Sequence, residues 1–229
     1  TDDNYASIVS AIEQGRIIYS NIRKFVFFLV SCNIAEILII FTSMLAGLPI
    51  PLRPIQLLWL NLVTDGAPAL ALGLEKGDPD VMQRPPRQPK EPVINREMLF
   101  RIVAQSLADT VAVMAAFIWS LSLYPDHVEV ARTVAFATLI CVELVRAYSA
   151  RSEYHSVRSI GPFSNRWMVL ATGTSFSLML ATLYIPVLQP IFDTVPLTPE
   201  QWLFVLPFVF FPFLVAEATK PIVRRMRKG

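Results

Sequence analysis

The chain has 229 residues, of which 54% are hydrophobic and only 17% charged, and its formal net charge is +2. A soluble domain of this length could not bury so much apolar surface, so the composition excludes that class and indicates a polytopic membrane protein. The two cysteines, Cys32 and Cys141, both fall inside apolar stretches, and we therefore expect neither a disulfide framework nor a thiolate metal site.

Residues 1–24 predict a cytosolic helical lead-in, because Tyr5, Ile8, Val9 and Ile12 follow one another at helical spacing. A single apolar stripe on so short a segment cannot form its own core. We therefore expect it to pack on something outside this chain.

Six later stretches approach the roughly 20 mostly apolar residues that a membrane-spanning helix needs. They cover residues 25–46, 55–74, 98–121, 130–148, 167–188 and 202–219. The sequence thus predicts an all-α fold, a polytopic bundle of six transmembrane helices over residues 25–219. A basic cytosolic tail is expected at residues 220–229.

The basic residues predict the orientation of this bundle. Of the 20 Lys and Arg residues, only Arg53 and Arg132 lie in or directly beside the three short connections on one side. By the positive-inside rule both termini are cytosolic, and the net charge then reflects topology and contact with membrane lipid, with no nucleic-acid partner. The remaining long connection, residues 75–97, is rich in proline, which forbids a regular helix. It is either a plain linker or a strap that contacts a cytosolic domain.

Oxygen-bearing side chains lie near the middle of the first two predicted spans. Asn33 and Glu36 are three residues apart, and Asn61, Thr64 and Asp65 stand at i, i+3 and i+4, so each set falls on one helical face. At about 1.5 Å of rise per residue, the two sets lie at similar depths in a hydrocarbon core about 30 Å thick. Ionised groups at such depths are costly and usually functional, and these oxygens are the ligands that calcium prefers. The pattern points to ion transport.

Four further residues bear on this site. Gly66 and Pro68 directly follow Asp65 and are expected to loosen the helix there, which frees backbone carbonyls. Glu143, in the fourth span, is the third acidic candidate; the alternative is that each acidic residue is a lone interhelical hydrogen bonder. Asp109, in the third span, is expected to be a neutral or hydrogen-bonded packing contact more than a ligand.

Several motifs together resemble the C-terminal part of type II cation-transporting P-type ATPases, and most of all the sarcoplasmic-reticulum-type and bacterial calcium pumps. They are the lead-in through Gly15-Arg16, Asn33-x-x-Glu36, the run 58–66 (Leu-Trp-Leu-Asn-Leu-Val-Thr-Asp-Gly), and Met82-x-Arg84-Pro85-Pro86-Arg87. The resemblance covers essentially the whole chain, and it implies that the six spans are the fifth to tenth transmembrane helices of that family.

The resemblance also implies roles for individual residues. One calcium site would be formed by Asn33, Glu36, Thr64, Asp65 and Glu143. Asn61 and Asp65 would contribute to a second site, which in the family also uses a helix absent here. Residues 1–24 would be the end of the phosphorylation domain and the stalk, and the 75–97 loop would meet that domain during coupling. ATP and Mg²⁺ would act only in the full-length parent, in a bacterial plasma membrane.

The chain departs from the family in two respects that matter. The partners it would need are missing from it: the actuator, phosphorylation and nucleotide domains and the first four helices, so this chain alone cannot hydrolyse ATP. Arg146 stands one turn from Glu143, where the reticulum-type pumps carry a neutral residue. It either pairs with Glu143 and cancels a ligand charge, or extends to the cytosolic headgroups. Alternative functions are a pump for manganese, sodium or protons, and an orphan membrane protein that binds cations passively or scaffolds a partner.

Overall fold

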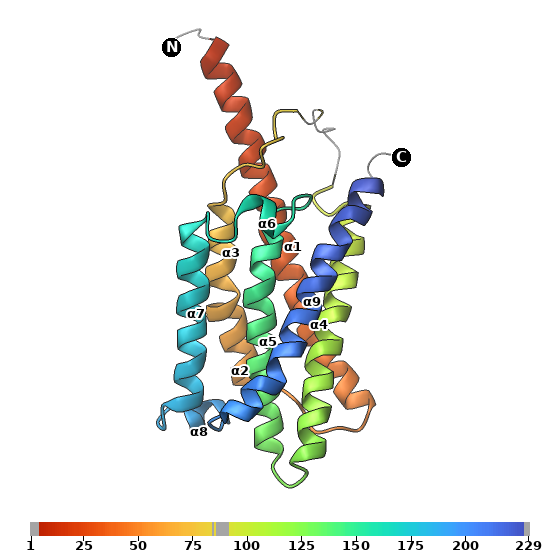
Figure 1. Cartoon of the computed structure of the whole chain (residues 1–229), viewed down its shortest axis with the longest axis vertical. Coiled ribbons are helices and arrows are strands. Elements are labelled where there is room, and N and C mark those ends of the chain that lie inside the picture. The colour runs from red at the N-terminus through yellow and green to blue at the C-terminus, as the bar shows by residue number, and fades with distance from the viewer. Residues whose placement is uncertain (1–4, 84, 86–91, 227–229) are drawn as a thin grey trace.

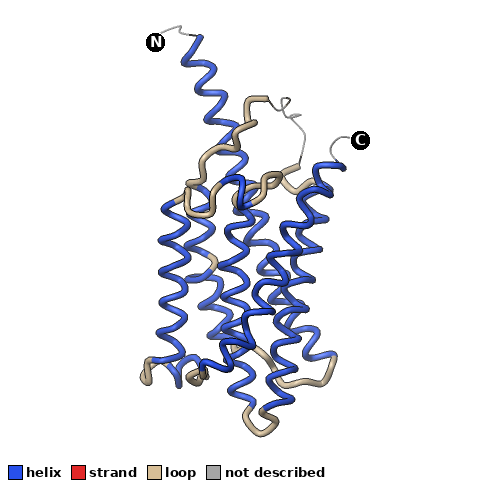
Figure 2. Tube along the Cα trace, in the orientation of Figure 1, coloured by secondary structure: helices blue, strands red, loops and turns tan. Residues whose placement is uncertain are grey.

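In the computed structural model, the description covers residues 5–83, 85 and 92–226, and the part of the chain so described is helical with no strand (Figures 1 and 2). The helices are α1 (Tyr5–Leu45), α2 (Pro54–Trp59), η1 (Leu60–Thr64), α3 (Gly66–Gly73), α4 (Arg96–Leu123), α5 (Val128–Ala150), α6 (Val157–Ile160), α7 (Arg166–Tyr184), α8 (Gln189–Phe192) and α9 (Pro199–Met226). The long helices run side by side as one bundle. The first turn of α1 and the last turn of α9 lie at the same end of it (Figure 1).

Among the described residues, five helical segments are long and apolar enough to cross a membrane. They are Tyr5–Leu45, Pro54–Gly73, Arg96–Leu123, Arg166–Tyr184 and Pro199–Arg224. The remaining predicted span, residues 130–148, corresponds to α5, which carries Glu143 and Arg146 and is buried along most of its length. It packs against α4, α7 and α9, and also touches α1, α3 and η1. Protein, more than lipid, therefore surrounds α5. Charged residues are less costly in this protein environment than in contact with lipid.

The lead-in and the first span form one uninterrupted helix of 41 residues, α1. The apolar residues Tyr5, Ile8 and Ile12 on its first turns are exposed, as expected for a stripe that packs on something outside the chain. Gly47 ends this helix at φ +66°, a left-handed conformation that glycine adopts without strain. The N-terminal residues Asp2, Asp3 and Asn4 lie outside the described residues.

The C-terminal end differs from the prediction. Helix α9 continues past residue 219 to Met226, so the expected tail at 220–229 begins inside a helix, and residues 227–229 lie outside the described part. Lys220 is buried at 2% exposure and donates to Glu217 Oε1 at 2.6 Å and to the His155 carbonyl at 2.9 Å. Lys220 and Glu217 thus form a local i,i+3 ion pair. A side chain so enclosed cannot belong to a basic surface cluster.

The proline-rich connection shows no helix in its described residues before α4 begins at Arg96, as the prolines predict, while residues 84 and 86–91 lie outside the description. Its first residues are held by a buried ion pair. Arg151, just after α5, donates to both oxygens of Glu75 at 2.8 and 3.0 Å. Asn165, which caps α7, donates to the same carboxylate at 2.8 Å. This network joins the ends of α3, α5 and α7.

Two hydrophobic clusters fill the bundle, one above the other. Ile39, Leu60 and Ile140 belong to the first. Phe28 and Ala147 belong to the second. Along α1 and along the α2–α3 segment the acidic candidates fall between the two clusters, and along α5 Glu143 lies where the first cluster ends, one turn before Ala147 of the second. The bundle therefore has a polar layer between two apolar ones.

Candidate cation-binding site

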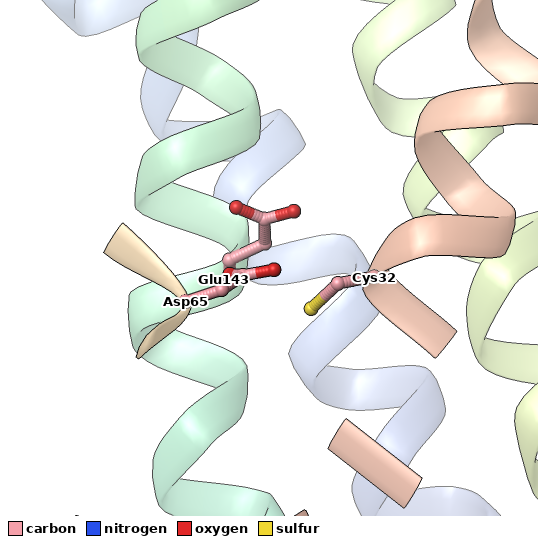
Figure 3. A group of neighbouring side chains, drawn as sticks. All are labelled: Cys32, Asp65 and Glu143. Carbon is pink, nitrogen blue, oxygen red and sulfur yellow. The ribbon is translucent and has the colours of Figure 1, made fainter. Parts of the chain in front are cut away.

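Three acidic side chains form this polar layer, and each comes from a different element. Glu36 lies on α1, Asp65 at the junction of η1 and α3, and Glu143 on α5; all three are buried. Figure 3 shows Asp65 and Glu143 next to each other, with Asp65 extending toward Cys32 of α1. One ligand atom from each of Cys32, Asp65 and Glu143 lies within 4.8 Å of the other two. The structure thus brings carboxylates from distant parts of the sequence into one group.

Most oxygens of this group lack a hydrogen-bond donor. Within the described residues, Glu36 Oε1, both oxygens of Asp65 and both oxygens of Glu143 are buried and accept no hydrogen bond. Leaving one buried polar group unpaired costs about 1–3 kcal/mol, and more when it is charged. Five such oxygens in one place are therefore compatible with a stable fold only if cations or protons balance them. The donor set, all oxygen among the carboxylates, suits a hard divalent ion.

The helix that carries Asp65 is interrupted at the site. Residues Leu60–Thr64 form a single π-helical turn, in which the Asp65 N–H donates to the Leu60 carbonyl at 2.9 Å. Such turns are rare in proteins as a whole, but those that occur are often found at functional sites. Pro68 has no N–H, so it cannot donate to the Thr64 carbonyl. The loosening expected from Gly66 and Pro68 is therefore present, and it places Asp65 between two differently wound segments.

Two neutral candidates support the carboxylates. The Asn61 amide donates to Glu36 Oε2 at 2.8 Å across the α1–η1 contact, although Asn61 itself is exposed. Thr64 is buried, and its hydroxyl donates to the Leu60 carbonyl at 2.9 Å. Since that bond uses the hydroxyl hydrogen, the lone pairs of the Thr64 oxygen stay available to a ligand.

Asn33 is the predicted residue that the structure does not bring to this group. Its side chain is exposed and donates to the Leu29 carbonyl at 2.8 Å in its own helix. Cys32 faces the group instead, although the sequence suggested no metal site for either cysteine. A signal was available, since Cys32 and Glu36 are four residues apart and share a helical face.

Arg146 does neither of the two things that the sequence suggested. It is 1% exposed, so it does not extend to the headgroups, and its ion partner is Asp109, with Nη1 to Oδ2 at 3.0 Å, instead of Glu143. It also donates to Ser31 Oγ at 2.9 Å and to Cys32 Sγ at 2.6 Å. Gln105 donates to the other Asp109 oxygen at 2.9 Å. Asp109 is thus a hydrogen-bonded packing contact, as predicted, but it also carries an ion pair.

A second set of charges lies beside the bundle, outside the acidic layer. Glu153, in the loop after α5, accepts two bonds from the Arg23 guanidinium at 3.0 and 3.2 Å. Burial alone would raise the pKa of Glu153, but the nearby charges of Arg23 and Arg101 and the bonds from Arg23 lower it below the ordinary value. Glu153 is therefore an ionised structural partner.

The chain is similar over nearly all of its length to known proteins. The family described as "Cation transporting ATPase, C-terminus" matches residues 49–222. A "Calcium-transporting ATPase" of Bacillus subtilis (strain 168) is 47% identical over 216 residues, which are 94% of this chain and 24% of that protein. A "Calcium-transporting ATPase 1" of Bacillus cereus (strain ATCC 10987 / NRS 248) is 39% identical over 234 residues, covering 96% of this chain and 26% of that protein. The chain thus spans about a quarter of the length of these curated relatives.

Proposed function

Because this chain belongs to the family of cation-transporting ATPase C-terminal regions, we propose that it is the ion-binding membrane half of an ATP-driven calcium pump. The single observation that carries the proposal is a set of buried carboxylates on three elements: ligand atoms of Asp65 and Glu143 lie within 4.8 Å of each other, and within the described residues five of the six oxygens of Glu36, Asp65 and Glu143 accept no hydrogen bond. Calcium is the cargo in this proposal. Glu36, Asp65 and Glu143 supply its charged ligands, and Thr64 supplies a neutral oxygen.

The proposal includes a second ion, to which Asn61 and Asp65 would contribute. Asn33 and Asn61 lie on the exposed side of α1 and of the second segment. Asn61 already bonds Glu36, so it links the buried site to this edge. A further helix supplied by the rest of the polypeptide would cover that face and add ligands to Asn61 and Asp65. ATP and Mg²⁺ belong to that remainder, and both ends of this chain face the cytosol of a bacterial plasma membrane.

The transport step that we propose depends on a difference in regularity between the helices that carry the three carboxylates. Glu36 and Glu143 lie on unbroken helices, whereas Asp65 lies at the π-helical turn. A conformational change driven by phosphorylation elsewhere would shift the Asp65 segment most easily. That shift weakens cation binding, and protons replace the cation on the carboxylates as it leaves outward.

The test uses the full-length polypeptide that carries this chain, in membrane vesicles. Asp65→Asn keeps the shape of the side chain and removes its charge, so calcium-dependent phosphorylation and ⁴⁵Ca²⁺ uptake should both be lost. Asp126→Asn, in the exposed turn between α4 and α5, is the matched control and should behave as wild type. Unchanged calcium-dependent phosphorylation in Asp65→Asn would refute the assignment. Uptake of manganese in place of calcium would keep the pump and change its ion.

A further inference from the structure

A sulfur atom lies beside the carboxylate oxygens of the proposed calcium site. Cys32 is completely buried on α1, and its Sγ is one of the three ligand atoms that lie within 4.8 Å of one another, the others coming from Asp65 and Glu143 (Figure 3). In the described structure both carboxylates have both oxygens unpaired. The sulfur therefore lies beside acceptors that have no donor of their own.

The surroundings hold the sulfur in place. Arg146 Nη2 donates to Cys32 Sγ at 2.6 Å, and the same guanidinium is anchored by Asp109 and Ser31. Because Asp109 balances the charge of Arg146, the charges of Asp65 and Glu143 remain for another cation. The second cysteine offers a contrast, since Cys141 is only partly buried and packs against the apolar cluster that contains Ile140.

One sulfur and two carboxylates favour a softer ion than calcium. Calcium binds oxygen almost without exception, whereas zinc and other thiophilic ions take thiolate ligands. With metal–sulfur bonds of about 2.3 Å and metal–oxygen bonds of about 2.0–2.2 Å, ligand atoms around one such ion are roughly 3–4 Å apart. Atoms already within 4.8 Å need only a small contraction to reach that spacing.

We propose that Cys32, Asp65 and Glu143 form a binding site for a thiophilic divalent cation, Cd²⁺ or Zn²⁺, which competes with calcium for the same carboxylates. The proposal rests on the proposed function, because it assumes that these carboxylates bind the transported ion. As the metal–sulfur bond forms, the thiol proton passes to water and one divalent charge is bound. The ion then occupies the carboxylates that calcium needs.

The experiment measures metal binding by the purified full-length polypeptide in detergent, with Cd²⁺ as the probe. Its two readouts are the ultraviolet absorption of cadmium–thiolate bonds and the displacement of ⁴⁵Ca²⁺ by Cd²⁺. Cys32→Ser is compared with wild type and with the matched control Cys141→Ser, and Cys32→Ala repeats the test without a hydroxyl. Retained ⁴⁵Ca²⁺ binding shows that each variant is folded.

Loss of the sulfur ligand should weaken Cd²⁺ binding by roughly 10- to 100-fold in both Cys32 variants and remove part of the thiolate absorption. Calcium affinity of Cys32→Ser should change by less than about twofold, since calcium does not need the sulfur. Cys141→Ser should match wild type. Equal cadmium affinity and absorption in wild type and Cys32→Ser would overturn the proposal.

The Asp65→Asn variant separates this proposal from the proposed function. If it abolishes ⁴⁵Ca²⁺ binding while Cys32→Ser leaves Cd²⁺ binding unchanged, the calcium site stands and the thiophilic site is refuted. If it leaves ⁴⁵Ca²⁺ binding intact while Cys32→Ser loses Cd²⁺, the proposed function fails. A sulfur site at Cys32 is then supported, but the proposed competition for shared carboxylates is refuted.

Discussion

The buried ion pair between Arg146 and Asp109 should dominate the stability of the middle of the bundle. The two side chains are 1% and 0% exposed and lie 3.0 Å apart. Arg146→Met keeps most of the apolar length of the side chain and removes its charge. Asp109 then holds a buried charge without a partner, so the variant should lose about 3–5 kcal/mol of unfolding free energy. The two further bonds to Ser31 and Cys32 add to this loss.

A double-mutant cycle tests the reasoning. Asp109→Leu alone should cost a similar amount, because it leaves Arg146 uncompensated, but the double variant should cost several kcal/mol less than the sum of the two. Unfolding is followed by tryptophan fluorescence in mixed detergent micelles. A cycle of Arg146→Met with Glu143→Gln is the control and should show a smaller coupling. Additive losses for the first pair, or a loss below about 1 kcal/mol for Arg146→Met, would refute the pairing.

Three other changes have definite expectations. Gly47→Ala should lower stability by about 1–2 kcal/mol, because Gly47 has φ +66°. Gly73→Ala should not lower stability, because a Cβ atom added at Gly73 meets no atom within 4 Å. Equal thermal shifts for the two variants would contradict this account. Because the pKa of Glu153 is lowered in the fold, its contribution is present above its ordinary value of 4.5 and is lost as pH falls through the folded value. Stability measured from pH 6 down to 3 should fall less steeply in Glu153→Gln; identical slopes would exclude Glu153 as the cause. Asn165→Ala should cost about 1–2 kcal/mol in thermal unfolding, since Asn165 caps α7 and also bonds Glu75.

The helices were predictable because a long apolar stretch is enough to specify a membrane-spanning helix, and the six predicted spans locate every long helix among the described residues. The residues at which the helices end were less predictable. Pro207, Pro212 and Pro221 lie inside α9 without ending it. Each proline removes one backbone donor, yet packing against α4 and α5 retains the helix. Proline therefore predicted the irregular backbone of the described loop residues between α3 and α4 correctly and gave no guide to the end of α9.

The acidic group was predictable in part. Carboxylates at mid-membrane depth are rare, and the few that the sequence contains are expected to lie together around a shared cation or proton. Spacing within one helix gave two neighbours for Glu36, Cys32 at i−4 and Asn33 at i−3, which lie on opposite flanks of the same face. Only the packing of α1 against its neighbours selects Cys32. The partner of Arg146 depends likewise on how α4 and α5 are placed along each other, which spacing inside α5 cannot specify.

The unbroken length of α1 has a mechanical consequence. At about 1.5 Å per residue, its 41 residues make a rod about 60 Å long. Tyr5 at the exposed end and Glu36 at the ion site belong to the same rod, so a push or a twist applied to the first turns reaches Glu36 with little loss. The neighbouring segment changes from a π-helical turn to an α-helix at Asp65, and we expect it to deform more easily under the same force. In the proposed pump, the cation would thus be bound between a rigid helix and a more easily deformed segment, and a force applied outside the membrane would change the geometry of its site.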